Sequence, residues 1–157
     1  MTVTWRGAVS YALTVVVLSW LVGAGVDLAW QAAPGGNVAG WADFWWKNPW
    51  HAVFVCAATA SLVLARRLLA PLPRWRVMLV DGSVYLAALL VCWGVSAWVE
   101  GDVAPADWAF VMAIVALYTF QLPAAWVLCV WRAGSLEVVL SGTGTGTDEL
   151  HGGLAGR

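Results

Sequence analysis

The sequence contains little charge. Only 11% of its 157 residues are charged and 62% are hydrophobic, whereas about a quarter of the residues in a soluble domain are charged. Eight basic and nine acidic residues give a net charge of −1, which excludes the strongly basic surface typical of nucleic-acid-binding proteins. We therefore expect the chain to fold in a lipid bilayer and to bind no nucleic acid.

Cysteine and histidine are also scarce. Each cysteine lies alone in an apolar run, and the chain has no CxxC pair and no Cys/His spacing typical of a metal site. We expect buried thiols that pack as small hydrophobic groups, with no metal site and no cofactor. The three cysteines and two histidines are Cys56, Cys92, Cys129, His51 and His151.

In place of charge, the sequence has long apolar segments. They predict an all-α integral membrane protein whose residues 1–132 form a four-transmembrane-helix bundle. Residues 133–157 include the low-complexity run GTGTGT and are predicted to form a flexible cytoplasmic tail. Four segments are long enough to cross a bilayer, which takes about 20 helical residues: about 8–30, 49–65, 77–99 and 108–131.

The basic residues indicate an orientation for these segments. If the four segments alternate in direction, six arginines lie on one side of the membrane and Lys47 lies alone on the other. Because arginine and lysine collect on the cytoplasmic side, the sequence predicts a multi-pass protein of the cell membrane with both termini in the cytoplasm. The six arginines are Arg6, Arg66, Arg67, Arg74, Arg76 and Arg132.

Tryptophan is abundant. The chain has 13, and the stretch WADFWWKNPW at 41–50 holds four of them. Ten of the 13 fall at predicted membrane boundaries, where an indole ring can lie in lipid while its N–H reaches a polar partner. Trp41, Phe44 and Trp45 share one helical face. Residues 40–47, in the connection between the first two segments, are therefore predicted to form a short amphipathic helix in the membrane interface.

Three tryptophans, Trp20, Trp93 and Trp126, lie deeper than the predicted boundaries. Indoles at such depths fill space between helices and donate to a neighbouring polar group, or they line a ligand pocket. The first interpretation is favoured by the sequence. If a pocket is present, we expect Tyr85, Trp93 and Gln121 to line it.

A proline interrupts the last apolar segment. Pro123 has no N–H to donate to the carbonyl of Thr119, four residues earlier. The sequence therefore predicts a kink in a continuous fourth helix. Thr119 and Gln121 are polar groups beside this kink, and we expect them to need partners from neighbouring helices.

Ionisable residues within membrane segments are costly, and each is a candidate functional group. Asp81 and Glu100 are 19 residues apart in one segment, roughly 28 Å along a helix axis at 1.5 Å per residue, so they cannot form a carboxylate pair within one chain. Asp27, His51 and Glu100 share the outer level. They are either acid/base candidates that converge on a polar mouth or separate, solvated helix ends.

Asp81 lies about one helical turn inside the arginine-rich boundary. An isolated carboxylate at that depth needs a partner, and three arginines are within sequence reach: Arg6, Arg66 and Arg67. We therefore predict that Asp81 forms a structural ion pair that fixes the order of the helices.

Three functions remain open. The favoured hypothesis is a non-enzymatic subunit, accessory protein or assembly factor of a larger membrane complex, since no catalytic motif is present. The alternative is a membrane-embedded acid/base enzyme of isomerase or cyclase type, in which Asp27, His51 and Glu100 act on a lipophilic, isoprenoid-like substrate. A small transporter ranks third. The expected partners are the lipid bilayer, a membrane protein or a second copy of this chain, and a lipophilic small molecule.

Overall fold

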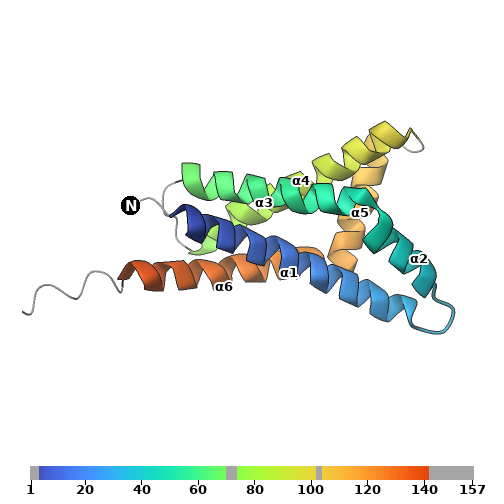
Figure 1. The fold of residues 1–157 in the computed structure, drawn as a ribbon, viewed down its shortest axis with the longest axis horizontal. Helices are drawn as coiled ribbons and strands as arrows, with labels where there is room; N and C mark the ends of the chain where they lie inside the picture. Colours follow the sequence, from blue (N-terminus) through green and yellow to red (C-terminus); the bar gives the residue numbers. More distant parts are fainter. Residues whose placement is uncertain (1–3, 70–73, 102–103, 142–157) are drawn as a thin grey trace, which may run out of the picture.

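The computed structural model describes residues 4–69, 74–101 and 104–141. Every regular element among these residues is helical (Figure 1). In chain order the elements are α1 (Trp5–Gln31), α2 (Val38–Ala42), a π-helical turn η1 (Asp43–Lys47), α3 (Pro49–Leu68), α4 (Arg74–Glu100), α5 (Pro105–Tyr118) and α6 (Gln121–Ser141).

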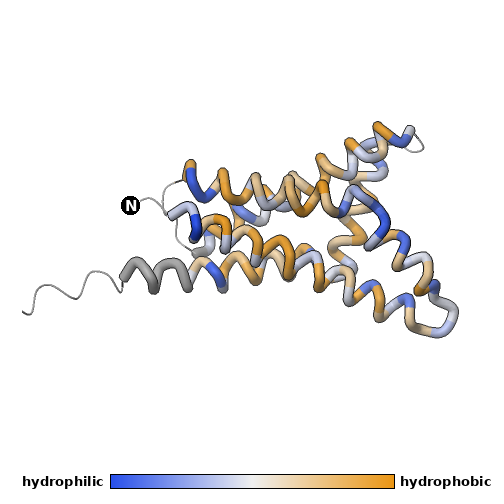
Figure 2. Tube along the Cα trace, in the orientation of Figure 1, coloured by the Kyte–Doolittle hydropathy of each residue, from blue (hydrophilic) through white to orange (hydrophobic). Residues whose placement is uncertain are grey.

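Several of these helices are long and apolar enough to cross a membrane. α1, α3 and α4 each meet that requirement alone, and α5 with α6 meets it as a pair bent by 65°. Figure 2 shows apolar residues along the middle of the helices and hydrophilic residues near the ends and connections. The described residues therefore confirm an all-helical chain, with three helices, or four if the bent pair is one span, that are long and apolar enough to cross a membrane.

The starts of α1 and α3 follow from their capping residues. The Thr4 hydroxyl accepts a hydrogen bond from the N–H of Gly7, and the Asn48 side chain accepts one from Trp50. Pro49 takes the first position of α3, where its missing N–H leaves no intrahelical bond unmade. α3 continues to Leu68, beyond the predicted end of the second segment.

Four long helices pack into one apolar core. α1 contacts α3 and α6, and α4 contacts the same two helices, so these four close around a common interior. Tyr11 and Val15 of α1, Phe54 of α3, and Tyr85 and Leu89 of α4 are fully buried there. The start of α1, the end of α3, the start of α4 and the end of α6 lie at the same end of the molecule, here called the arginine end (Figure 1).

The last apolar segment differs from the prediction. It is not one kinked helix but two helices, because the chain breaks at Thr119 and Phe120. Phe120 has a φ of +59°, a left-handed conformation that no α-helix can continue through. Pro123 follows within the first turn of α6, where helical N–H groups have no intrahelical acceptor. The proline is therefore placed where its missing N–H costs nothing.

The C-terminal part of α6 also extends further than expected. α6 continues to Ser141, past residue 133, where the sequence places the start of a flexible tail. The rest of that predicted tail, residues 142–157, lies outside the described residues.

The segment between α1 and α3 folds back over the end of α1. The predicted single helix at 40–47 is instead the five-residue α2 followed directly by η1. The indole N–H of Trp41 donates to the Ala24 carbonyl at 3.0 Å, which fixes α2 against α1. Asp43 and Lys47 form an exposed ion pair on η1, while Trp45 points inward and is buried.

Candidate functional site

An aromatic cluster lies where the first turn of α3 meets α1, η1 and α4. It consists of Trp20, Phe44, Trp45, His51 and Trp93, which come from α1, η1, α3 and α4. His51 is at its centre. The imidazole stacks on Trp45 at a centroid distance of 4.7 Å and meets Phe44 and Trp93 edge-to-face at 4.9 and 5.0 Å. The cluster thereby joins η1 to three long helices.

One hydrogen bond fixes the neutral tautomer of His51. Trp20 Nε1 donates to His51 Nδ1 at 3.2 Å, so the ring proton belongs on Nε2. Nε2 is buried and has no hydrogen-bond partner. Only 5% of the residue's surface is exposed, so surrounding rings, not solvent, provide its environment. The His51 side chain is therefore packed among aromatic rings.

The two acidic candidates are bonded to other tryptophans. Trp45 Nε1 donates to Asp27 Oδ2 at 2.7 Å, and Trp50 Nε1 donates to Glu100 Oε1 at 2.8 Å. Asp27 is therefore linked to His51 only through the Trp45 ring. Glu100 is exposed at the end of α4. Each of the three acid/base candidates thus has its own indole partner, and no hydrogen bond joins any two of them.

A second polar group lies in the middle of the core. Tyr85 of α4 accepts hydrogen bonds from Ser19 of α1 at 2.9 Å and from Gln121 of α6 at 2.8 Å. Gln121 also approaches α1 closely, since a Cβ placed on Gly23 would lie 3.0 Å from it. Tyr85 and Gln121, predicted to line a pocket, instead bond to one another and tie three helices together.

Trp20 and Trp93 fill space between helices, as the sequence favoured, whereas Trp126 is 40% exposed. Trp20 donates to His51, and Trp93 stacks on Phe44 with ring centroids 6.0 Å apart. Trp126 of α6 lies directly over Gly82 of α4, where a Cβ would come within 2.3 Å of the indole nitrogen. Trp93, the remaining predicted pocket residue, is buried inside the aromatic cluster.

Asp81 is paired near the arginine end. Its carboxylate forms an ion pair with Arg66 of α3 at 2.8 Å and accepts a hydrogen bond from the Tyr11 hydroxyl of α1. Asp81 is fully buried and Arg66 is nearly so. Of the three arginines considered from the sequence, Arg66 takes this role. Arg67 instead lies over the ring of Trp5.

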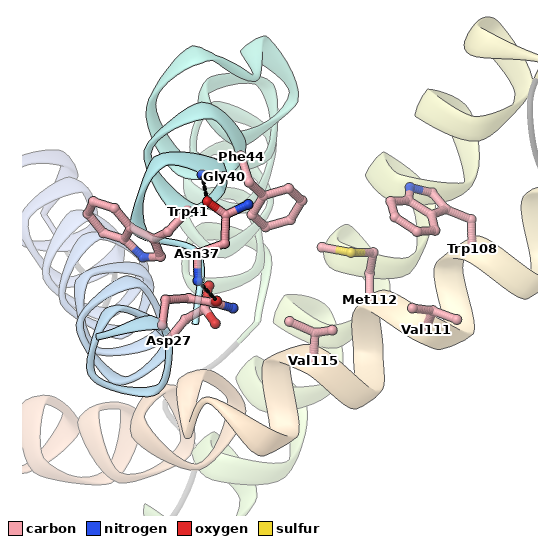
Figure 3. Close-up of a pocket in the computed structure, with 10 residues that line it drawn as sticks. Asp27, Asn37, Gly40, Trp41, Phe44, Trp108, Val111, Met112 and Val115 are labelled. Carbon is pink, nitrogen blue, oxygen red and sulfur yellow. Dashed lines mark hydrogen bonds between the residues drawn. The ribbon is translucent and has the colours of Figure 1, made fainter. Parts of the chain in front are cut away.

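An open groove separates α1 and α2 from α5. Its first cavity, about 300 Å³, has the Asp27 carboxylate and the rings of Trp41 and Phe44 on one side, with Trp108 and Met112 of α5 on the other (Figure 3). A second cavity of about 310 Å³ shares Asp27 and continues along α5. The two cavities together are called the α1–α5 groove below.

Sequence reasoning identified Asp27 but not the groove that it lines. The groove exists because α5 diverges from α6 at Phe120 and packs chiefly against α4. Trp108 of α5, which lines the first cavity, was assigned only to the membrane boundary. The sequence shows only that Trp108 follows the acidic connection. This position does not specify the direction in which the indole points.

Among the residues that the structure describes, no three His, Cys, Asp or Glu side chains gather closely enough to hold a metal ion. The three cysteines are free thiols. Comparison with known proteins gives no significant match to any protein-family model, any curated protein or any solved structure.

Proposed function

We propose that this chain is a four-span protein of the cell membrane that acts as a non-enzymatic subunit or accessory factor of a larger membrane complex. Both termini face the cytoplasm in this proposal. One observation carries it: Asp27, His51 and Glu100 are each bonded to a different tryptophan and do not form one reactive group. The polar side chains thus serve to connect helices.

An acid/base enzyme requires an acid and a base that both reach the substrate. His51 is enclosed by aromatic rings, and it is not among the residues that line the α1–α5 groove. Glu100 lies at the surface and is bonded to Trp50. Asp27 alone faces the groove, so the predicted acid/base group does not assemble around a common cavity.

A transporter requires polar groups that can exchange partners along a path. Here the Tyr85 hydroxyl is already held between Ser19 and Gln121, and the Asp81 carboxylate is held between Arg66 and Tyr11. These bonds join neighbouring helices in a packed interior. The arrangement therefore supports a structural role for the central polar residues.

A face suited to a partner helix lies between α1 and α6. Leu18, Leu21 and Val22 of α1 and Val127 and Leu128 of α6 border an apolar depression of about 470 Å³. Helices associate in membranes through close packing rather than through a hydrophobic driving force. A groove of this kind provides surface on which a partner's transmembrane helix can pack.

The test is to purify the full chain from its native membrane in a mild detergent and to measure the mass of the intact assembly. We expect a partner at fixed stoichiometry. Val127→Trp should release the chain from that assembly because it fills the depression. Val91→Trp is the matched control, since Val91 on α4 is 64% exposed and Val127 is 67% exposed, but Val91 lies outside the depression.

The proposal fails if the wild-type chain is recovered alone at the mass of one protomer. The depression between α1 and α6 is not the partner site if the Val127→Trp and Val91→Trp variants retain the partner equally. Turnover of a lipophilic substrate by the isolated chain, lost in Asp27→Asn, would favour the enzyme instead.

A further inference from the structure

The Asp27 carboxylate lacks a cationic partner in the described part of the chain. One of its oxygens accepts the Trp45 indole N–H, and no residue in the described ranges forms a salt bridge with it. Asp27 is half-buried and lines both cavities of the α1–α5 groove. A carboxylate in this position has an oxygen available to a group that enters the groove.

The rings around the first cavity fit a particular kind of charge. Trp41 and Phe44 lie on the same side as Asp27, and Trp108 lies across the gap on α5 (Figure 3). The face of an aromatic ring is negative and attracts organic cations, most strongly those without tightly bound water. A carboxylate together with indole and phenyl rings is therefore suited to an alkylammonium group.

The second cavity extends the site in an apolar direction. Besides Asp27, its lining includes Ile114, Val115 and Tyr118 of α5 and Trp30 of α1. Trp30 and Tyr118 are largely exposed, so this part of the groove opens at the side of the molecule. A hydrocarbon chain can lie there with its polar end at Asp27.

The charges near the groove discriminate between two kinds of amphiphile. A zwitterionic lipid would bring a phosphate beside its ammonium group and would need a basic partner for it. Lys47 is the sole basic residue between α1 and α3, and its ammonium group is paired with Asp43. The first cavity has one carboxylate and no basic residue in its lining. A net cation therefore suits the site better than a zwitterion.

We propose that the α1–α5 groove binds a lipophilic organic cation, with its ammonium group between Asp27 and the rings of Trp41, Phe44 and Trp108 and its hydrocarbon chain along α5. This binding site is independent of the partner face between α1 and α6.

The experiment uses the full chain in phosphatidylcholine nanodiscs and radiolabelled dodecyltrimethylammonium as the probe. Binding is measured by equilibrium dialysis, and uptake by empty nanodiscs is subtracted. We expect saturable binding to one site that Asp27→Asn weakens roughly tenfold or more, the range expected for loss of a charged partner. The asparagine retains an oxygen for the Trp45 indole N–H, so the link between α1 and η1 is preserved.

Asp43→Asn is the matched control, because it removes an acid from the same end of the molecule without changing the groove lining. It should leave the affinity unchanged within about twofold, as expected for an exposed charge. Val111→Trp, which fills the first cavity from α5, should also abolish binding and provides a second variant if Asp27→Asn folds poorly.

Two further probes separate the kinds of ligand. Dodecylphosphocholine and an uncharged analogue with carbon in place of nitrogen should both bind more weakly than the trimethylammonium probe. Equal binding by the zwitterion would show a phospholipid headgroup site and overturn the proposal. Equal losses in Asp27→Asn and Asp43→Asn, or binding that persists in Val111→Trp, would overturn it as well.

Discussion

At the scale of single residues, tryptophan N–H groups provide hydrogen-bond donors for three polar side chains. Indole N–H groups of Trp20, Trp45 and Trp50 donate to His51, Asp27 and Glu100. Each indole buries a large apolar ring and brings one donor to an acceptor at the end of the molecule. The abundance of tryptophan thus has a second cause besides the preference of the indole for membrane boundaries.

The buried ion pair between Asp81 and Arg66 is the contact whose disruption we expect to cost the most stability. Removing one member leaves the other charged and buried, which typically costs about 3–5 kcal/mol. We therefore predict that Asp81→Leu and Arg66→Met each lower the free energy of unfolding by roughly that amount. The double variant should be within about 2 kcal/mol of wild type, because only the Tyr11 hydroxyl then lacks its acceptor.

Unfolding by sodium dodecyl sulfate in mixed micelles, followed by tryptophan fluorescence, measures these free energies. Tyr11→Phe serves as the control, since it removes one hydrogen bond to Asp81 and leaves the ion pair intact. If the effects of Asp81→Leu and Arg66→Met are additive in the double variant, the two charges do not stabilise one another and the interpretation is wrong.

Sequence reasoning reached the depth of Asp81 and limited its partner to three arginines, but it did not identify the partners of Tyr85. The spacing of four residues places Asp81 and Tyr85 on one face of α4 at two levels. It does not specify how that face is rotated relative to α3 and α6. Tyr85 consequently bonds to Gln121, a residue whose own direction depends on the break at Phe120.

At the scale of elements, the break between α5 and α6 shapes the groove. Pro123 predicted a distortion of the helix, but the sequence did not predict a complete break into two helices. The reason is that α5 has apolar residues on all sides. Periodicity assigns a buried face only when one side of a helix is polar. Phe110, Ile114 and Tyr118 of α5 remain exposed, as suits a helix in contact with lipid, so the sequence gives no preferred face to predict.

The left-handed conformation of Phe120 provides the test for this break. A β-branched residue is strongly disfavoured at positive φ, whereas glycine adopts it freely. We predict that Phe120→Gly has a free energy of unfolding roughly 1–2 kcal/mol above that of Phe120→Ile. Phe120 is exposed, so little packing is lost in either variant, and unfolding in mixed micelles measures the difference.

Leu117 is the matched control for Phe120. It is exposed in the last turn of α5 and has helical geometry, where glycine is less stable than isoleucine by a few tenths to about 1 kcal/mol. The order of the two variants should therefore reverse between positions 117 and 120. The same order at both positions would show that the chain does not break at Phe120.

At the scale of the whole molecule, the arrangement of helix ends follows from the charge pattern. Arg6, Arg66, Arg67 and Arg76 come from three different helices yet lie at one end, with the end of α6 beside them (Figure 1). The alternation of apolar segments and basic connections predicts this grouping. The side on which each connection lies depends only on how many apolar segments precede it. The 65° bend between α5 and α6 still leaves the end of α6 at the arginine end (Figure 1).

The final prediction concerns the proposed orientation of this arginine end. Green fluorescent protein fused after Ser141 should fluoresce, because it folds in the cytoplasm, and alkaline phosphatase fused there should be inactive. Phosphatase inserted into the connection between α4 and α5 should be active, because it is exported. Arginine-rich ends are retained in the cytoplasm, and the same two reporters exchanged between the two positions provide the control. Active phosphatase after Ser141 would reverse the orientation, place Asp27 and the α1–α5 groove on the cytoplasmic side, and require a ligand that approaches from within the cell.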